Sequence, residues 1–333
     1  SWTLTALPLF VWMGEILFRT RLSENLFKGL SPWMQKLPGG LIHVNVVGCA
    51  LFAAISGSSA ATVATVGKMS IPELRKRNYP EKILLGSLAG SGTLGLLIPP
   101  SIILIIYGVA VQESIAKLFI AGILPGIMIA LIFMSYVIFW SLINKKQMPK
   151  IIEEYSIFEK IKRSKQLLPV IFLISAVIGS IYTGIATATE AASLGVVGAL
   201  ILSYFQKSLT LETFKTSLLG ATKTSCMIAF ILAGSTFLSL AMGFTGLPRN
   251  LAMWIQNMDL SPYVLIFVLM IFYIILGMFL DGISAVVLTM AIIEPMIRQA
   301  GFDMIWFGIF LVIVVEMAQI TPPVGFNLFV LQG

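Results

Sequence analysis

Four short breaks in the apolar stretches of this chain hold the residues best suited to do chemistry. Residues 56–59 (SGSS) and 281–284 (DGIS) combine Gly with hydroxyl or carboxylate side chains, whereas residues 98–101 (IPPS) and 321–325 (TPPVG) contain paired prolines. A proline lacks an amide hydrogen and clashes with the carbonyl one turn earlier, so paired prolines free carbonyl oxygens on their N-terminal side. Those oxygens and nearby hydroxyls suit a hard cation such as Na⁺. The Gly/Ser breaks offer amides at a helix N-terminus, which favour a carboxylate.

The elements that must position these breaks are membrane-spanning helices. Hydrophobic residues make up 58% of the chain and charged residues 11%, whereas a soluble domain carries about 25% charged residues. Apolar runs of about 17 or more residues recur, and such runs cross about 30 Å of hydrocarbon. Because unpaired backbone groups are costly in lipid, a break persists only where protein, water or an ion satisfies it. A single break could be an ordinary kink, but four at matched positions favour a binding site.

The distribution of charge excludes nucleic acid as a partner and points to a lipid bilayer. The net charge is +7, yet 18 of the 22 Lys and Arg residues lie in four connections between apolar runs. Such clustering is typical of cytoplasmic connections in membrane proteins. Residues 144–166 form the longest of them and are predicted to be a cytoplasmic linker. Cys49 and Cys226 lie in apolar segments and are predicted to be small buried residues.

An internal repeat relates the two ends of the chain at one constant offset. Three prolines match without a gap, because Pro72, Pro99 and Pro100 correspond to Pro295, Pro322 and Pro323. The equivalent connections hold eight basic residues in the first half and two, Arg249 and Arg298, in the second. The two halves are therefore predicted to cross the membrane in opposite directions, an architecture common among secondary transporters.

The predicted fold is an all-α polytopic membrane protein with inverted repeats. Each repeat contains a re-entrant helical hairpin followed by a helix broken at Pro-Pro. A scaffold surrounds a transport domain made of the two repeats. The predicted divisions are residues 1–36 (scaffold helix and interfacial arm), 37–110 (first transport repeat), 111–221 (scaffold helices with the linker 144–166), 222–260 (scaffold helix and arm) and 261–333 (second transport repeat).

Several motifs together resemble the large (DctM-like) membrane subunit of tripartite ATP-independent periplasmic (TRAP) transporters. The resemblance spans nearly the whole chain and implies an elevator-type Na⁺ symporter in the bacterial inner membrane. It also implies a small membrane subunit and a periplasmic substrate-binding protein as partners, and a small organic anion, a carboxylate, as substrate. The motifs are residues 57–62 (GSSAAT), 98–101 (IPPS), 107–108 (YG), 118–126 (LFIAGILPG), 279–282 (FLDG) and 320–325 (ITPPVG).

The resemblance also implies particular ion ligands. In the family one Na⁺ lies between the first hairpin tip and the first break, and the internal repeat suggests a second site. The expected ligands of the first Na⁺ are Ser56, Ser58 and the backbone carbonyls of Gly95, Ile98 and Pro100, and those of the second are Gly282, Thr321 and Pro323. The expected substrate-binding residues are Asn45, Ser58, Ser59, Ser284 and Thr321. Residues 187–190 (TATE) depart from the family's usual Thr-Pro-Thr-Glu, so no site is expected there.

Other polar residues leave alternatives open. Asp281 either organises an ion site or caps a helix, and Glu190 and Glu316 either act functionally or accept freed amides. His43 is expected to be structural. Residues 90–95 (GSGTLG) match a dinucleotide fingerprint by letter, but without a preceding strand close helix packing explains their glycines better.

Rival functions differ in what they require. An enzyme is disfavoured, because the chain has no Ser/His or Cys/His constellation. A stand-alone Na⁺/dicarboxylate symporter of related design would need no binding protein. A channel is a further alternative, although paired re-entrant tips with matched breaks favour alternating access. Nothing in the sequence distinguishes a dicarboxylate from a sialic acid, a keto acid or ectoine as the substrate.

Overall fold

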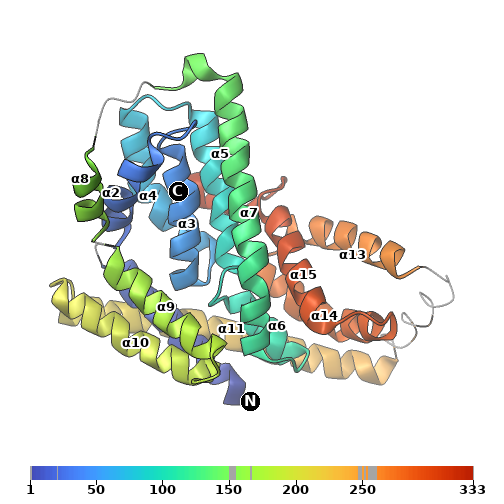
Figure 1. Ribbon diagram of the computed structural model, residues 1–333. Helices are drawn as coiled ribbons and strands as arrows, with labels where there is room; N and C mark the ends of the chain where they lie inside the picture. Colours follow the sequence, from blue (N-terminus) through green and yellow to red (C-terminus); the bar gives the residue numbers. More distant parts are fainter. Residues whose placement is uncertain are drawn as a thin grey trace.

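A computed structural model describes residues 2–20, 22–149, 155–165, 167–246, 250, 253 and 261–332 of the chain. These residues form helices joined by short connections, and none of them forms a strand (Figure 1). Four helices are long and apolar enough to cross a membrane, and four shorter helices are also apolar. The prediction of an all-α polytopic membrane protein is confirmed.

The first third of the chain folds into eight helical segments. They begin with two helices, followed by a helix pair and a broken helix. Their bounds are η1 Trp2–Thr5, α1 Ala6–Phe18, α2 Leu22–Met34, α3 Ile42–Ser56, α4 Ser59–Lys76, α5 Glu81–Gly92, η2 Thr93–Leu96 and α6 Ile102–Ala110.

The remainder contains the longest helices and a second helix pair with a broken helix. Their bounds are α7 Ile115–Ile143, η3 Lys145–Gln147, α8 Ile157–Ser164, α9 Leu168–Tyr182, α10 Ala188–Phe205, α11 Leu211–Thr245, α13 Pro262–Gly277, α14 Gly282–Gln299, α15 Met304–Gln319 and α16 Phe326–Gln332.

Helix boundaries follow from capping chemistry. Hydroxyl and carboxylate side chains accept hydrogen bonds from first-turn amides at the starts of several helices, including Ser101 at α6, Thr210 at α11 and Asp303 at α15. Gly57 ends α3 with a φ of 60°, a left-handed conformation that costs a glycine little. The break after residue 56 is therefore fixed by local sequence.

The two helix pairs pack in a reciprocal way. Helix α3 packs against α5, and α13 packs against α15. Helix α4 of the first pair packs against α16 from the C-terminal end, while α14 of the second pair packs against α6. Figure 1 shows the consequence, since the red C-terminal segment reaches the blue and cyan helices near α3 and α4. The core is thus shared between segments from the two ends of the chain.

Helix bounds also recur at the offset found in the sequence. That offset pairs the first and last residues of α4, Ser59 and Lys76, with Gly282 and Gln299, which are the first and last residues of α14. Helix α15 likewise begins at the counterpart of the first residue of α5. The peptide bonds Pro99–Pro100 and Pro322–Pro323, which are separated by the same offset, are both cis. These correspondences place the four breaks at equivalent positions in two helical units.

Some details differ from the predictions. Helix α11 begins at residue 211, before the crossing predicted from residue 222, so Lys215 and Lys223 lie on a helix and not in a connection. Thr210 caps this longer helix, and local capping overrides the polar composition that suggested a loop. Cys49 is buried as expected, but Cys226 is exposed on α11. Arg249 and parts of the segments 144–166 and 222–260 lie outside the described residues.

Candidate functional site

A cavity of about 650 Å³ lies where the tips of the two helix pairs meet helices α1 and α11. The first tip contributes residues 56–61, and the second contributes residues 281–283. Gln319 at the end of α15 and residues 102–103 at the start of α6 complete the inner wall. The opposite wall comes from α1 and α11, through Glu15, Phe18, Thr224, Met227, Ile228 and Ile231 among others.

The first tip gathers hydroxyl and carbonyl oxygens. The Oγ of Ser56 lies 2.8 Å from the Oγ1 of Thr62 and donates to the carbonyl of Ser58 over 3.2 Å. The Thr62 hydroxyl also donates to the Ser58 carbonyl, at 2.8 Å. Ser58 is the N-cap of α4, yet its side chain accepts no capping hydrogen bond from the helix. The tip therefore holds closely spaced oxygens beside a helix N-terminus without a side-chain cap.

The first tip packs directly against the first Pro-Pro break. The Ile102 amide donates to the Gly57 carbonyl over 3.3 Å, and a Cβ on Gly57 would lie 2.7 Å from the Pro100 carbonyl oxygen. A Cβ on Gly95 would lie only 2.6 Å from the Ser58 carbonyl oxygen. The structure thus brings together Ser56, Ser58, Gly95 and Pro100, four of the five expected ligands of the first Na⁺.

The remaining expected ligand, Ile98, and the nearby glycines make close helix contacts around this break. The Ile98 side chain packs against the position of Gly126 on α7, where a Cβ would meet it at 2.8 Å. A Cβ on Gly92 would lie 1.9 Å from the Val63 side chain. Close helix packing therefore explains the glycines of residues 90–95 without any nucleotide.

At the second tip, Asp281 caps α14. Its carboxylate accepts hydrogen bonds from the amides of Ile283 at 3.1 Å and Ser284 at 3.2 Å, and from the Ser284 hydroxyl. Gly282 lies so close to α15 that a Cβ would meet the Val315 side chain at 2.8 Å. Of the two roles open for Asp281, the structure displays capping, and the Ser284 hydroxyl is engaged in the same network.

Gln319 joins the two tips, and sequence reasoning missed it. Its Oε1 accepts a hydrogen bond of 2.7 Å from the Ser59 hydroxyl of the first tip. Its Nε2 lies 3.2 Å from the position of a Cβ on Gly282 in the second tip. The available signal was a polar residue in a largely apolar helix, two positions before Thr-Pro-Pro. Thr62 was missed as well, although it follows Ser58 by one helical turn.

Seven expected site residues are not among those that line the cavity: Asn45, Gly95, Ile98, Pro100, Ser284, Thr321 and Pro323. Asn45 is buried between α3 and α5, where its Nδ2 donates to the Ser87 hydroxyl over 2.9 Å. The Thr321 hydroxyl donates to the Met317 carbonyl one turn earlier over 2.6 Å, and Pro323 is exposed. The structure therefore assembles the first tip with its break, but does not bring Thr321 or Pro323 to that oxygen cluster.

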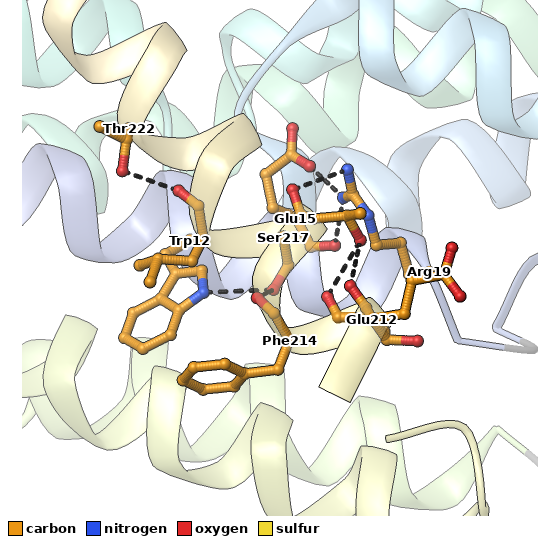
Figure 2. A network of polar contacts seen from close by, with 10 residues as sticks. Trp12, Glu15, Arg19, Glu212, Phe214, Ser217 and Thr222 are labelled. Carbon is orange, nitrogen blue, oxygen red and sulfur yellow. Dashed lines mark hydrogen bonds and ion pairs between the residues drawn. The ribbon is translucent and has the colours of Figure 1, made fainter. Parts of the chain in front are cut away.

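The scaffold wall of the cavity is tied together by polar contacts between α1 and α11 (Figure 2). Glu15, which lines the cavity, forms an ion pair with Arg19 one turn along α1. A Cβ on Gly220 would lie 2.6 Å from the Glu15 carboxylate, so only a glycine allows this close approach. Arg19 donates to the Thr216 carbonyl of α11 over 3.3 Å. These contacts hold the wall independently of the tips.

The other ionisable residues considered in the sequence make local contacts, except Glu316, to which the structure assigns no role. Glu190 forms a capping box with Thr187, accepting the Thr187 amide at 2.8 Å. The Nε2 of His43 lies 2.7 Å from the Pro38 carbonyl, in keeping with a structural residue. Glu316 is buried, and its Oε1 has no hydrogen-bond partner among the described residues. The described residues contain no group of three or more His, Cys, Asp or Glu side chains suited to a metal.

Comparison with known proteins gives one consistent result. A family model described as "Tripartite ATP-independent periplasmic transporter, DctM component" matches residues 1–333. The C4-dicarboxylate TRAP transporter large permease protein DctM of Pseudomonas aeruginosa is 33% identical over 99% of this chain and 77% of its own length. The 2,3-diketo-L-gulonate TRAP transporter large permease protein YiaN of Escherichia coli is 32% identical over 100% of this chain and 78% of its own. The sialic acid TRAP transporter large permease protein SiaM of Vibrio cholerae is 30% identical over 100% and 77%.

Proposed function

We propose that this chain imports a small organic anion together with Na⁺, because it belongs to the DctM component of tripartite ATP-independent periplasmic transporters. This family consists of bacterial membrane transport proteins and not of enzymes. The relatives named above carry a C4-dicarboxylate, 2,3-diketo-L-gulonate and sialic acid, all organic acids. By extension, the substrate of this chain would also be a carboxylate. The chain would lie in the bacterial inner membrane.

The observation that carries the proposal is the cavity shared by both tips. Residues 56–61 and 281–283 belong to helix pairs far apart in the sequence, yet they line one space together with Gln319. In that space, Ser56 and Ser58 offer oxygens for a hard cation, and the Thr62 hydroxyl is hydrogen-bonded to both residues. The first turn of α4 offers backbone amides that would donate hydrogen bonds to a carboxylate. One cavity thus supplies ligands for both the cation and the anion.

Na⁺ would order the first tip before the anion binds. The Ser56 hydroxyl donates to the Ser58 carbonyl in this tip, and the Pro100 carbonyl of the following break lies against Gly57. A cation bound between these oxygens would hold the tip and the break together. Under this proposal, Ser58 and Ser59 contact substrate directly, whereas Asn45, Ser284 and Thr321 would require a rearrangement to do so.

The second Na⁺ site is proposed around Gly282, Thr321 and Pro323 on the grounds of repeat symmetry. The matched helix bounds of α4 and α14 and the reciprocal packing of α4 with α16 and α14 with α6 support an inverted repeat. In such a design, a transport domain made of residues 37–110 and 261–333 slides as an elevator against the scaffold. The polar ties between α1 and α11 favour a rigid scaffold wall.

The partners follow from the same proposal. A periplasmic binding protein would deliver the anion, and a small membrane subunit would complete the scaffold. The alternative is a stand-alone Na⁺/dicarboxylate symporter, which would need neither partner. The relatives named above are all large permease proteins of TRAP transporters, which favours the tripartite arrangement.

Uptake in proteoliposomes tests the proposal. The chain is reconstituted with the small subunit, the binding protein is added outside, and accumulation of a labelled organic acid is measured under an inward Na⁺ gradient. The expected result is uptake that stops when choline replaces Na⁺ and when the binding protein is omitted. Equal uptake in choline would remove the Na⁺ assignment. Uptake by this chain alone would favour the stand-alone symporter.

A further inference from the structure

Helix α8, within the connection between the apolar helices α7 and α9, carries an apolar surface that no described residue covers. Ile157 is 74% exposed, Phe158 77% and Ile161 49%. Successive helical positions are separated by about 100°, so these three side chains occupy one side of α8. Large apolar side chains gathered on one side of a short helix need a partner, because leaving them in water is unfavourable.

Basic residues border this apolar side. Lys160 precedes Ile161, and Lys162 follows it, so the two lie on opposite edges of the apolar stripe. Lys165 follows the last turn. Arg163 lies away from the stripe, where its guanidinium stacks 4.3 Å from the centre of the Tyr155 ring. Long basic side chains at the edges of an apolar stripe are the arrangement that places charges at lipid headgroups.

The orientation of α8 is fixed by contacts with α2 along one edge of the apolar stripe. The Trp33 indole donates to the Ser164 hydroxyl over 2.8 Å, and that hydroxyl donates to the Gly29 carbonyl over 3.3 Å. The Lys160 ammonium lies 5.3 Å from the centre of the Trp33 ring. A capping box between Ser156 and Glu159 closes the N-terminal end of α8. These contacts hold α8 along one edge and leave Ile157 and Phe158 exposed.

The place of α8 in the chain determines which medium it meets. Helix α7 is long and apolar enough to cross a membrane, and α9 is apolar over its whole length. A helix between two such segments lies at the boundary of the bilayer. The basic residues of this connection place that boundary on the cytoplasmic side. A cytoplasmic leaflet carries anionic phospholipids, which complement the charge of Lys162 and Lys165.

We propose that α8 lies in the cytoplasmic membrane–water interface, with Ile157, Phe158 and Ile161 inserted among acyl chains and with Lys162 and Lys165 bound to anionic phospholipid headgroups. The anchor would hold the scaffold at a fixed depth while the transport domain moves. The inference depends only on the membrane location of the chain and is independent of the substrate and of Na⁺.

Lipid quenching tests this directly in the assembled transporter. Cys226 is replaced by Ser, and a nitrobenzoxadiazole label is attached at Phe158→Cys or, as the control, at Arg163→Cys on another side of α8. The labelled complex is reconstituted into vesicles of phosphatidylcholine or phosphatidylglycerol with brominated acyl chains, and the fluorescence is compared with that in unbrominated vesicles. We expect strong quenching at position 158 and at most a third of that at position 163.

The charge part of the proposal has its own readout. The ratio of quenching in mixed vesicles gives the relative affinity of the site for phosphatidylglycerol over phosphatidylcholine. Each lysine near an anionic surface contributes about fivefold, so Lys162→Gln with Lys165→Gln should lower this ratio by at least about tenfold while quenching in pure phosphatidylcholine persists. Equal quenching at positions 158 and 163 would overturn the inserted orientation. If quenching at position 158 is lost only when the small subunit is present, that subunit covers the apolar side, and the proposal is overturned.

Discussion

Replacing Gly95 with alanine tests whether the contact between the first tip and the first Pro-Pro break forms the cation site. A Cβ at this position would lie 2.6 Å from the Ser58 carbonyl oxygen and 2.8 Å from the Thr62 hydroxyl, both closer than a carbon and an oxygen approach without displacement. The tip or the break must move. Overpacking of this kind costs about 1–3 kcal/mol, and the displaced oxygens are the proposed Na⁺ ligands.

Gly86 on α5 provides the matched control, because a Cβ there would meet nothing within 4 Å. Gly86→Ala should leave function unchanged and stabilise the helix by about 1 kcal/mol, the difference in helix propensity between the two residues. The two variants make the same chemical change in the same broken helix. They differ only in what the new methyl group touches.

The assay is thermal unfolding of the purified protein across a Na⁺ titration, with choline to keep ionic strength constant. A ligand that binds the folded state raises the unfolding midpoint with its concentration. For Gly95→Ala we expect the half-saturating Na⁺ concentration to rise by about tenfold or more, since about 1.4 kcal/mol corresponds to a factor of ten. A Gly95→Ala protein that keeps the half-saturating Na⁺ concentration within twofold of the parent would refute the assignment.

The remaining predictions concern residues around the same cavity. Thr62→Val removes a hydroxyl from the oxygen cluster and should weaken Na⁺ stabilisation severalfold, whereas Thr62→Ser should preserve it; equal loss in both would indicate a packing role. Gln319→Leu breaks the hydrogen bond to Ser59 and should raise the KM for substrate by about tenfold. The reason is that a hydrogen bond contributes about 1 kcal/mol and an orphaned hydroxyl costs more. An unchanged KM would argue against the bridge between tips. Arg19→Gln leaves the Glu15 carboxylate without its partner on the cavity wall and should lower the unfolding midpoint measurably, whereas Arg75→Gln, at an exposed ion pair, should not.

Much of the fold could be predicted from the sequence because the signals are local. Apolar runs define the helices, and caps such as Thr210, Asp281 and Asp303 define where helices begin. The Pro-Pro pairs and their constant spacing from one half to the other locate the breaks before any contact is known. Helix α11 begins earlier than predicted. The polar sequence after Thr210 was interpreted as a connection, although Thr210 caps a helix there.

The residues of the candidate site could be predicted from the sequence only in part. Motif resemblance led to Ser56, Ser58, Gly95 and Pro100, which the structure places together, since a tip and the break that follows it are neighbours in one repeat. It gave no indication of Gln319, whose partner Ser59 is 260 residues away.

The sequence by itself determined that this chain is a membrane transport subunit, where its helices break, and which chemical groups each break exposes. All of these depend on hydropathy, proline geometry and capping within a few residues. Only the tertiary structure decided that the two tips share one cavity, that Gln319 joins them, and that Glu15 forms part of the opposite wall. Those contacts depend on how helices from distant parts of the chain pack, and packing is set by the shapes of many side chains at once and not by any local pattern.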